Sequence, residues 1–529
     1  MMKRLLSLIT ALLATIVLAG CSSNMVSSTG SSGSPNASGE ADLTIVAATE
    51  LKDLTDLVHQ ASEELGFSIE LQFPAGTLEN SQSLARGMFD GKVDATWFAT
   101  NRYVNLIGAA DKLADETKLA TSPVAFGVWQ ESARRLGWDA KQPTWAEFAQ
   151  AAEAGQFTFG MTNPSASNSG FSALVSVATA LADTGEAVSP ADIERVSPTL
   201  KHLFQAQSMV SGSSGWLADA FVADPGRADA IINYESTLHQ LRQQGQPIDV
   251  VVPADGVISA DYPLSTLAEP AHPQAAERVR ELADWLLQHQ EDIASTYRRP
   301  VAQVSNVPEE IASQQVIELP FPANQAVVDD LLFAYNNEYR QPGTTTFILD
   351  TSGSMEGARI KSLREIMHSL IDGSASTLTG DVSLRDHENV TLWSFDTEPN
   401  APITVEFDRN DPATANALQE YVDQLSADGS TAMYRTLLDA LEATDTSEGI
   451  PSIVVLSDGE DNVGPRFKTF KGIYESLPAD KRAVPVFVIL YGEAKEKEME
   501  QLAQLTGGAV FDAQGGDLAT AFKEIRGFQ

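Results

Sequence analysis

Short apolar runs alternate with helical periodicity along the first part of the chain. The order is an apolar run at 43–48, an amphipathic stretch at 51–66, an alternating run at 67–73, a helical stretch at 81–90 and an apolar run at 93–98. This strand-helix-strand-helix-strand order predicts an α/β sheet. Ligand sites in such sheets lie at the carboxyl ends of the strands.

The same alternation returns in the second half of the chain. Strands are predicted at 345–350, 390–395, 403–407, 452–457, 484–490 and 509–512, and helices at 357–372, 412–425 and 497–506. The run at 484–490 is apolar throughout, which is typical of a strand buried on both faces. We therefore predict a second α/β region, a doubly wound Rossmann-like sheet. A linker at 311–342, with a helix from Val327 to Tyr339, joins the halves.

Oxygen-bearing side chains follow the first strand of this second sheet. Asp350, Ser352 and Ser354 stand at i, i+2 and i+4, so a carboxylate and two hydroxyls of one loop can face one point. Hard oxygen ligands of which few are charged suit Mg²⁺ or Mn²⁺. The D-x-S-x-S pattern resembles the metal-ion-dependent adhesion site (MIDAS) of von Willebrand factor type A (VWA) domains.

Two further loops extend this resemblance, in the family's order. Thr431 lies in the Gly-containing loop at 428–434, and Asp458 follows the apolar run at 453–457. The resemblance implies a VWA domain at 343–529 that binds Mg²⁺ or Mn²⁺, with Ca²⁺ as a further option. It implies direct contacts to the ion from Ser352, Ser354 and Thr431, and direct or water-mediated contacts from Asp350 and Asp458. A partner protein's Asp or Glu would complete the shell. The alternative is a capped loop without metal.

Enzymatic patterns are missing from the sequence. Aspartyl-phosphate hydrolases need a second Asp two residues after the first, where this chain has Ser352. The seven histidines form no close metal-ligand pair, and neither a G-x-S-x-G elbow nor a P-loop occurs. We therefore predict a binding protein, with a hydrolase as the disfavoured alternative.

Residues 42–310 resemble the type II periplasmic solute-binding proteins, most closely the molybdate/sulfate-type group. The loops at 47–50, 74–78, 162–171 and 231–236 carry the resemblance. It implies a fold of two hinged lobes that close over a small solute. The candidate ligand-binding residues are Thr49, Thr77, Asn163 and Tyr234. Helix capping for the first three and core packing for Tyr234 are equal alternatives.

The charge near this second candidate site is mixed. Helix N-termini near Ser81 and Ser169 would suit an anion. Glu50 and Glu235 stand beside the same loops and would repel one. The class of solute therefore stays open.

Composition and the N-terminus set the compartment. The formal net charge of −37 opposes binding to nucleic acid or to anionic membranes. Two basic residues precede an apolar run at 5–19 that is too short to span a bilayer, and the sequence then reads Leu18-Ala19-Gly20-Cys21. This resembles a bacterial lipobox. It implies a lipoprotein signal peptide at 1–20, lipid modification of Cys21, the chain's one cysteine, and a Ser/Gly-rich tether at 21–41.

These features together predict a lipid-anchored protein of the cell membrane or outer membrane that faces the periplasm or the exterior. It would bind a protein partner through a divalent metal and couple this to a solute-binding-like domain. The alternative is an ABC-transporter-type solute receptor that uses its VWA domain for docking.

Overall fold

A computed structural model describes residues 41–377, 380–447, 449–458, 461–490, 496–512 and 518–528. Residues 41–529 form one compact unit. The predictions for the signal peptide, for Cys21 and for the tether up to residue 40 fall outside the described residues. Within the described ranges, no helix has the length and apolar character needed to cross a bilayer.

The first lobe is built on a five-stranded sheet with the order β2-β1-β3-β11-β4. Strand β1 (Leu43–Ala47) runs parallel to β2 (Ile69–Gln72) and β3 (Ala95–Trp97), whereas β11 (Pro263–Thr266) runs antiparallel to β3 and β4 (Thr117–Lys118). All five residues of β1 are buried, as expected for a central strand. The helices of this lobe are η1 (Thr49–Leu54), α1 (Thr55–Leu65), α2 (Thr77–Ala85), α3 (Arg102–Leu106), η2 (Ala110–Lys112), α10 (Ala275–Gln288) and α11 (Gln290–Ser295).

The second lobe has the strand order β10-β5-β8-β6-β7, and β9 and β12 also pair with β5. Its strands are β5 (Ala120–Trp129), β6 (Phe159–Thr162), β7 (Gln207–Ser211), β8 (Ala230–Tyr234), β9 (Ile248–Val251), β10 (Ser259–Ala260) and β12 (Arg299–Pro300). Its helices are α4 (Gln130–Leu136), α5 (Trp145–Glu153), α6 (Asn168–Ala182), α7 (Pro190–Gln205), α8 (Ser214–Ala223) and α9 (Glu235–Gln243). Helix α12 (Glu309–Ala312) follows these elements in the chain.

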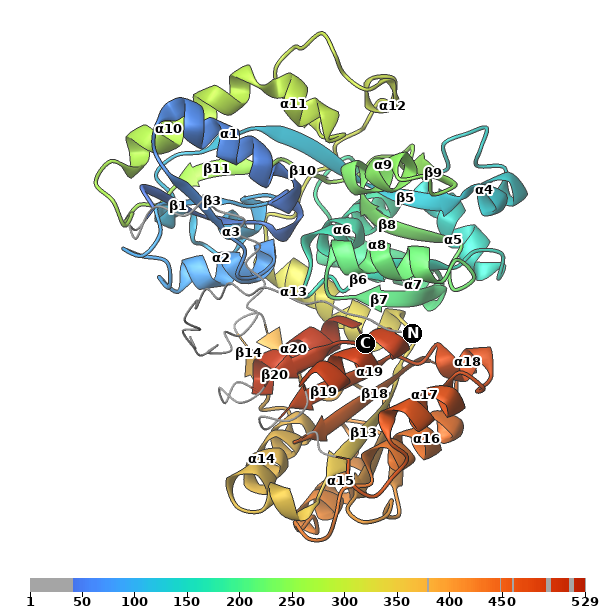
Figure 1. The fold of residues 1–529 in the computed structure, drawn as a ribbon. Coiled ribbons are helices and arrows are strands. Elements are labelled where there is room, and N and C mark those ends of the chain that lie inside the picture. Colours follow the sequence, from blue (N-terminus) through green and yellow to red (C-terminus); the bar gives the residue numbers. More distant parts are fainter. Residues whose placement is uncertain are drawn as a thin grey trace, which may run out of the picture. The chain divides into compact units, whose positions relative to one another are not determined.

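The chain crosses between the two sheets three times: from β4 to β5, from β10 back to β11, and from β11 by way of α10 and α11 to β12 (Figure 1). This confirms the two-lobed α/β fold expected for the first half.

One predicted helix start is wrong. Helix α2 begins at Thr77, with Gly76 as its extended N-cap, and not at Ser81. Ser81 lies one turn inside the helix, where its hydroxyl donates to the Thr77 carbonyl at 2.7 Å. Its backbone N–H therefore offers no helix terminus to an anion.

The second α/β region has a six-stranded sheet with the order β17-β16-β13-β18-β19-β20. The strands are β13 (Gly343–Asp350), β16 (Asn389–Phe395), β17 (Ile403–Glu406), β18 (Ile450–Ser457), β19 (Val486–Leu490) and β20 (Val510–Asp512). All neighbours are parallel except β17, which runs antiparallel to β16. A short hairpin, β14 (Ser376–Thr377) and β15 (Gly380–Asp381), stands apart from this sheet.

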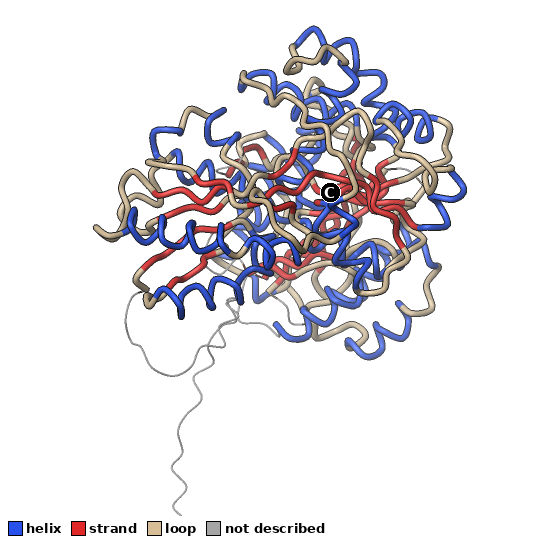
Figure 2. Tube along the Cα trace, turned by 90° about the horizontal axis from the view of Figure 1, so that it is seen from above, coloured by secondary structure: helices blue, strands red, loops and turns tan. Residues whose placement is uncertain are grey.

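Successive residues of these strands alternate between two cores, as the strand period of two requires. Phe347 and Leu349 of β13 belong to one core, together with α14, α15 and α20, and Ile348 belongs to the other, together with α16, α17 and α19. The helices are η4 (Gly353–Met355), α14 (Ala358–Asp372), α15 (Pro412–Asp423), α16 (Met433–Ala443), α17 (Phe467–Tyr474), α18 (Ala479–Arg482), α19 (Glu496–Thr506) and α20 (Leu518–Phe528). Helices thus cover both faces of this sheet, and in the protein as a whole many helices lie around the strands (Figure 2). This confirms the doubly wound sheet.

The expected linker helix is α13 (Gln325–Ala334), which continues as the one-turn π-helix η3 (Tyr335–Tyr339). Its apolar residues pack into the core of the two-lobed region. The Tyr335 hydroxyl donates to Gln207 Oε1 at 2.8 Å, and Asn336 Nδ2 donates to Ser165 Oγ at 3.0 Å. The linker is therefore a packed part of this fold.

Candidate functional site

The first loop of the candidate metal site begins at the last residue of β13. Asp350 is fully buried, and its Oδ1 accepts a 2.9 Å hydrogen bond from the Ser352 backbone N–H. Its Oδ2 accepts from the Ser457 hydroxyl at the end of β18. The hydroxyls of Ser352 and Ser354 lie 3.1 Å apart. These contacts fix the Asp350 carboxylate and place both hydroxyls together in one loop.

The second loop is tied to the first by backbone hydrogen bonds. Gly353 N donates to Gly429 O at 3.1 Å, and Asp428 N donates to Thr351 O at 2.8 Å. Thr431 is buried, and its backbone exchanges two hydrogen bonds with Asn462 on the third loop. The three loops, which together are spread over about a hundred residues of the sequence, thus meet at the carboxyl ends of β13 and β18.

The third loop contributes Asp458, directly after β18. Asp458 is buried, and its Oδ2 accepts a 3.0 Å hydrogen bond from Arg359 Nη1. The same guanidinium donates to the Ser354 carbonyl at 3.1 Å. Asp458 Oδ1 is also buried but has no hydrogen-bond partner among the described residues. A buried carboxylate oxygen without a partner is costly unless something else binds it.

The electrostatics of the loops suit a cation. Burial raises the pKa of Asp350 and the charge of Asp458 adds to the rise, while hydrogen bonds from Ser352 and Ser457 oppose it. In the described part of the chain, no group of three or more His, Cys, Asp and Glu side chains could hold a metal ion. A cation here would therefore depend on two carboxylates and on neutral hydroxyl oxygens, the donor set that the sequence predicted.

Asp461 has a structural task that the sequence did not reveal. Asp461 is half-buried and accepts hydrogen bonds from Tyr434 N at 2.9 Å and from Gly464 N at 3.1 Å. Tyr434 lies in the first turn of α16, so Asp461 caps that helix from another loop.

In the two-lobed region, two candidate ligand residues make hydrogen bonds within the protein. Thr77 Oγ1 accepts from Ala99 N at 3.0 Å. Asn163 Oδ1 accepts from Ser165 N at 2.9 Å, and its Nδ2 donates to the carbonyl of Arg526 on α20, also at 2.9 Å. These contacts favour the structural alternative for Thr77 and Asn163.

The other two candidates lie nearer to polar groups of the lobe junction. Thr49 is the half-buried first residue of η1. Tyr234 is buried at the end of β8, and its hydroxyl accepts a 2.9 Å hydrogen bond from Asn168 Nδ2. Asn168 begins α6, and the sequence had included it only as part of a loop.

Sequence reasoning missed two arginines next to these sites. Arg359 is 99 residues from its partner Asp458, and Arg298 is 245 residues from Asp53, which it contacts at 2.8 Å. No motif links such pairs, so only the folded chain reveals them.

Comparison with known proteins agrees with this division of the chain. Residues 72–291 match the family model "Bacterial extracellular solute-binding protein", and residues 346–524 match "von Willebrand factor type A domain". The human inter-alpha-trypsin inhibitor heavy chain H4 is 29% identical over 143 residues, which is 25% of this chain and 14% of that protein. The chain thus spans about a seventh of this curated relative.

Solved structures of both kinds are similar. One is the periplasmic binding protein AfuA from Actinobacillus pleuropneumoniae, with 12% identity and a TM-score of 0.46. The match covers 56% of this chain and 98% of that chain. The sulfate-binding protein SubI from Mycobacterium tuberculosis is 20% identical, with a TM-score of 0.41. The match covers 54% of this chain and 98% of that chain. A von Willebrand factor type A protein from Catenulispora acidiphila is 22% identical, with a TM-score of 0.29, 36% of this chain and 42% of that one.

The chain therefore carries a region of the bacterial extracellular solute-binding protein family, followed by a von Willebrand factor type A domain.

Proposed function

We propose that this chain is a cell-envelope protein that binds a protein partner through a divalent cation held by its VWA domain. The observation that carries the proposal is the buried Asp458 Oδ1, which has no partner among the described residues and stands at the meeting point of three loops rich in oxygen. A cation would give this oxygen the partner that it lacks.

Each loop would contribute in its own way. Ser352, Ser354 and Thr431 would supply neutral oxygens, and Asp350 and Asp458 the negative charge. A bound Mg²⁺ or Mn²⁺ with so few charged ligands offers a coordination position to a carboxylate of the partner. Asp350 is held in place by Ser352 and Ser457, so its position does not depend on the ion.

The proposal is tested with Asp350→Asn in the full chain. Asparagine keeps an oxygen that can accept the Ser352 hydrogen bond, and it removes a charge that burial disfavours. We expect unfolding stability to change by less than about 1 kcal/mol, while Mn²⁺ binding, measured by electron paramagnetic resonance of the free ion, is lost. Asp423→Asn is the control, because Asp423 is an exposed residue that pairs only with His368 in the described part.

Partner binding should follow the metal. Capture of envelope proteins by the wild-type chain should fail in EDTA and should fail for Asp350→Asn. Equal Mn²⁺ binding by wild type and Asp350→Asn would overturn the assignment of the ion to these loops. Capture that is unaffected by EDTA would show that the partner binds to another surface.

Two finer statements belong to the same proposal. The match to extracellular solute-binding proteins supports a location outside the cytoplasm, and Cys21 in its lipobox-like context would anchor the chain through lipid. Both matched families are typically non-catalytic, which supports a binding protein over an enzyme.

The second candidate function is that of a solute receptor that docks a partner through the VWA domain. Contacts between the two regions favour it. Lys523 of α20 forms an ion pair with Glu79 of α2 in the first lobe, and Asn163 of the second lobe donates to the Arg526 carbonyl of the same helix. A helix that touches both lobes would sense whether they are closed.

A further inference from the structure

A cluster of polar groups lies where the two lobes meet, in which Asn168, Tyr234 and Tyr262 are buried and Glu50 is half-buried. Glu50 comes from the first lobe, in the short helix η1 after β1, whereas Tyr234 ends β8 and Asn168 begins α6 in the second lobe. Asn168 Nδ2 donates to the Tyr234 hydroxyl at 2.9 Å, and Tyr234 interacts electrostatically with Glu50. The Tyr262 ring lies 6.4 Å from the Tyr234 ring, centroid to centroid. Elements from four distant parts of the sequence thus converge here.

Three oxygens of this cluster are buried without a hydrogen-bond partner among the described residues. They are Glu50 Oε1, Asn168 Oδ1 and the Tyr262 hydroxyl. The side chains of Asn168 and Tyr262 are almost completely buried, with 3% and 1% exposure. Two of the three oxygens are pure acceptors and the third can also accept, whereas Arg298 Nε is the neighbouring donor that is buried without a partner in the described part, so unpaired acceptors outnumber unpaired donors here.

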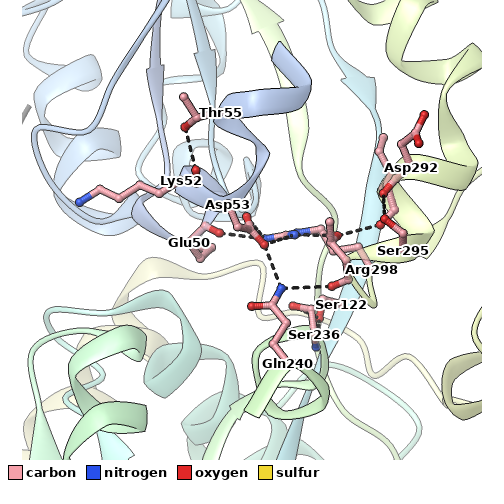
Figure 3. A network of polar contacts seen from close by, with 12 residues as sticks. Glu50, Lys52, Asp53, Thr55, Ser122, Ser236, Gln240, Asp292, Ser295 and Arg298 are labelled. Atoms are coloured by element: carbon pink, nitrogen blue, oxygen red, sulfur yellow. Dashed lines mark hydrogen bonds and ion pairs between the residues drawn. The ribbon is translucent and has the colours of Figure 1, made fainter. Parts of the chain in front are cut away.

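The charge of Glu50 is also uncompensated by an ion pair. The nearby Arg298 directs its guanidinium to Asp53, with 2.8 and 2.9 Å contacts to the two carboxylate oxygens, and reaches Glu50 only through its backbone carbonyl at 2.8 Å (Figure 3). Glu235 is paired with Arg299 at 2.7 and 2.8 Å. Within the described ranges, Glu50 has no such cation. Burial raises its pKa, which shows how little the surroundings stabilise its negative charge.

A hydrogen bond near this cluster joins the two lobes. Gln240 of α9 in the second lobe donates to Asp53 Oδ2 of the first lobe at 2.9 Å (Figure 3). Within the second lobe, the hydroxyls of Ser122 on β5 and Ser236 on α9 lie 3.2 Å apart. A solute at Glu50 would therefore be enclosed by groups from both lobes.

We propose that the lobe junction around Glu50 binds a small solute that carries an ammonium group, and not an oxyanion. This rests on the proposed solute-binding role of the two-lobed region. Glu50 supplies the opposite charge, and Asn168 Oδ1 and the Tyr262 hydroxyl accept hydrogen bonds from the N–H groups. The Arg298 guanidinium already lies over the Tyr262 ring, 5.3 Å from its centroid, so the Tyr234 ring is the aromatic group left to favour a further cation. An oxyanion would meet the Glu50 carboxylate and more unpaired acceptors than donors.

The test measures thermal unfolding of the full chain with three classes of probe. Putrescine and ethanolamine represent ammonium solutes, sulfate and molybdate represent oxyanions, and glucose represents neutral polyols. We expect a saturable rise in Tm with at least one amine and none with the other classes. Glu50→Gln should weaken that amine about tenfold or more, because a charge-assisted hydrogen bond is lost. Glu63→Gln, on the exposed face of α1, is the matched control.

A second variant, Tyr262→Phe, keeps the proposal testable if Glu50→Gln fails to fold. Tyr262→Phe keeps the ring and removes a hydroxyl that has no partner in the described part, so the apo protein should stay as stable as wild type while amine affinity falls. A Tm rise with sulfate, molybdate or glucose alone would overturn the ammonium class but keep the solute-binding role. A rise in Tm with an amine that persists in Glu50→Gln would show that the amine binds at another site. No response to any probe would contradict the solute-binding role itself.

Discussion

At the scale of single residues, Arg359 would compete with a divalent ion for the negative charge of Asp458. Its guanidinium lies 3.0 Å from Asp458 Oδ2, on the carboxylate that we assign to the ion. The Arg359 side chain is 41% exposed, so it can swing into solvent at little cost. Arg359 would then act as the resident counter-charge of the metal-free site.

Arg359→Gln should therefore tighten Mn²⁺ binding. Removing the competing charge should lower the Kd about threefold, a modest change because water screens an exposed pair. Isothermal titration of the full chain with Mn²⁺ measures the effect. Lys361→Gln removes the same charge from the same helix, where the lysine is 77% exposed and pairs with Glu365. Identical affinities for the two variants would show that Arg359 does not compete with the ion.

His239 is the other residue with a direct physical consequence. It is 4% exposed, stacks on the Tyr297 ring, and its Nε2 has no hydrogen-bond partner among the described residues. Burial lowers its pKa from 6.5 to about 4. The folded chain therefore keeps this imidazole neutral over a range in which the unfolded chain protonates it.

The sign of the pH effect follows from this shift. Between pH 6.5 and about 4 the unfolded state binds more protons at His239, so unfolding stability should fall as the pH is lowered through this range, by up to about 3 kcal/mol. Urea unfolding at several pH values measures it, and His239→Gln should flatten this part of the profile. His59, which is 71% exposed, provides the control variant His59→Gln. A profile unchanged by His239→Gln would assign the pH dependence to other groups.

At the scale of elements, the sequence predicted strands better than helix ends. The expected strands at 345–350 and 390–395 correspond to β13 (Gly343–Asp350) and β16 (Asn389–Phe395), because runs buried on both faces are visible in composition alone. Helix α2 was misplaced because Ser81 resembles an N-cap, while the helix starts at Thr77 after the extended Gly76, and the Thr77 hydroxyl accepts from the Ala99 N–H, 22 residues away.

The sequence indicated the metal loops but not the character of the cluster around Glu50. The metal loops were predictable because each follows a buried strand, and parallel strands end at one edge of a sheet. The cluster around Glu50 was not, because its character depends on where Arg298 places its charge. The sequence showed a carboxylate that would repel anions, but only the fold shows that the neighbouring arginine is already paired with Asp53.

At the scale of the whole molecule, helix α20 connects the VWA domain with both lobes. Its Ala521, Phe522 and Ile525 pack in the core of the VWA sheet, while Lys523 pairs with Glu79 and the Arg526 carbonyl accepts from Asn163. Each lobe is thus held to the same rigid element, which favours their closed arrangement.

Lys523→Ala should loosen this arrangement. Hydrogen exchange followed by mass spectrometry should become about fivefold faster at the start of α2 and at the loop around Asn163, equivalent to about 1 kcal/mol for a largely buried ion pair. The sheet cores should not change. Lys497→Ala, at an exposed lysine of α19, is the control. Unaltered exchange at both places would mean that α20 lies against the lobes without stabilising them.

The contact between Lys523 and Glu79 joins residues 444 positions apart. During synthesis, both lobes leave the ribosome before α20 exists. The first lobe therefore acquires this restraint last. A chain that ends before α20 would contain the residues of both lobes but would lack the ion pair that ties Glu79 to the VWA domain.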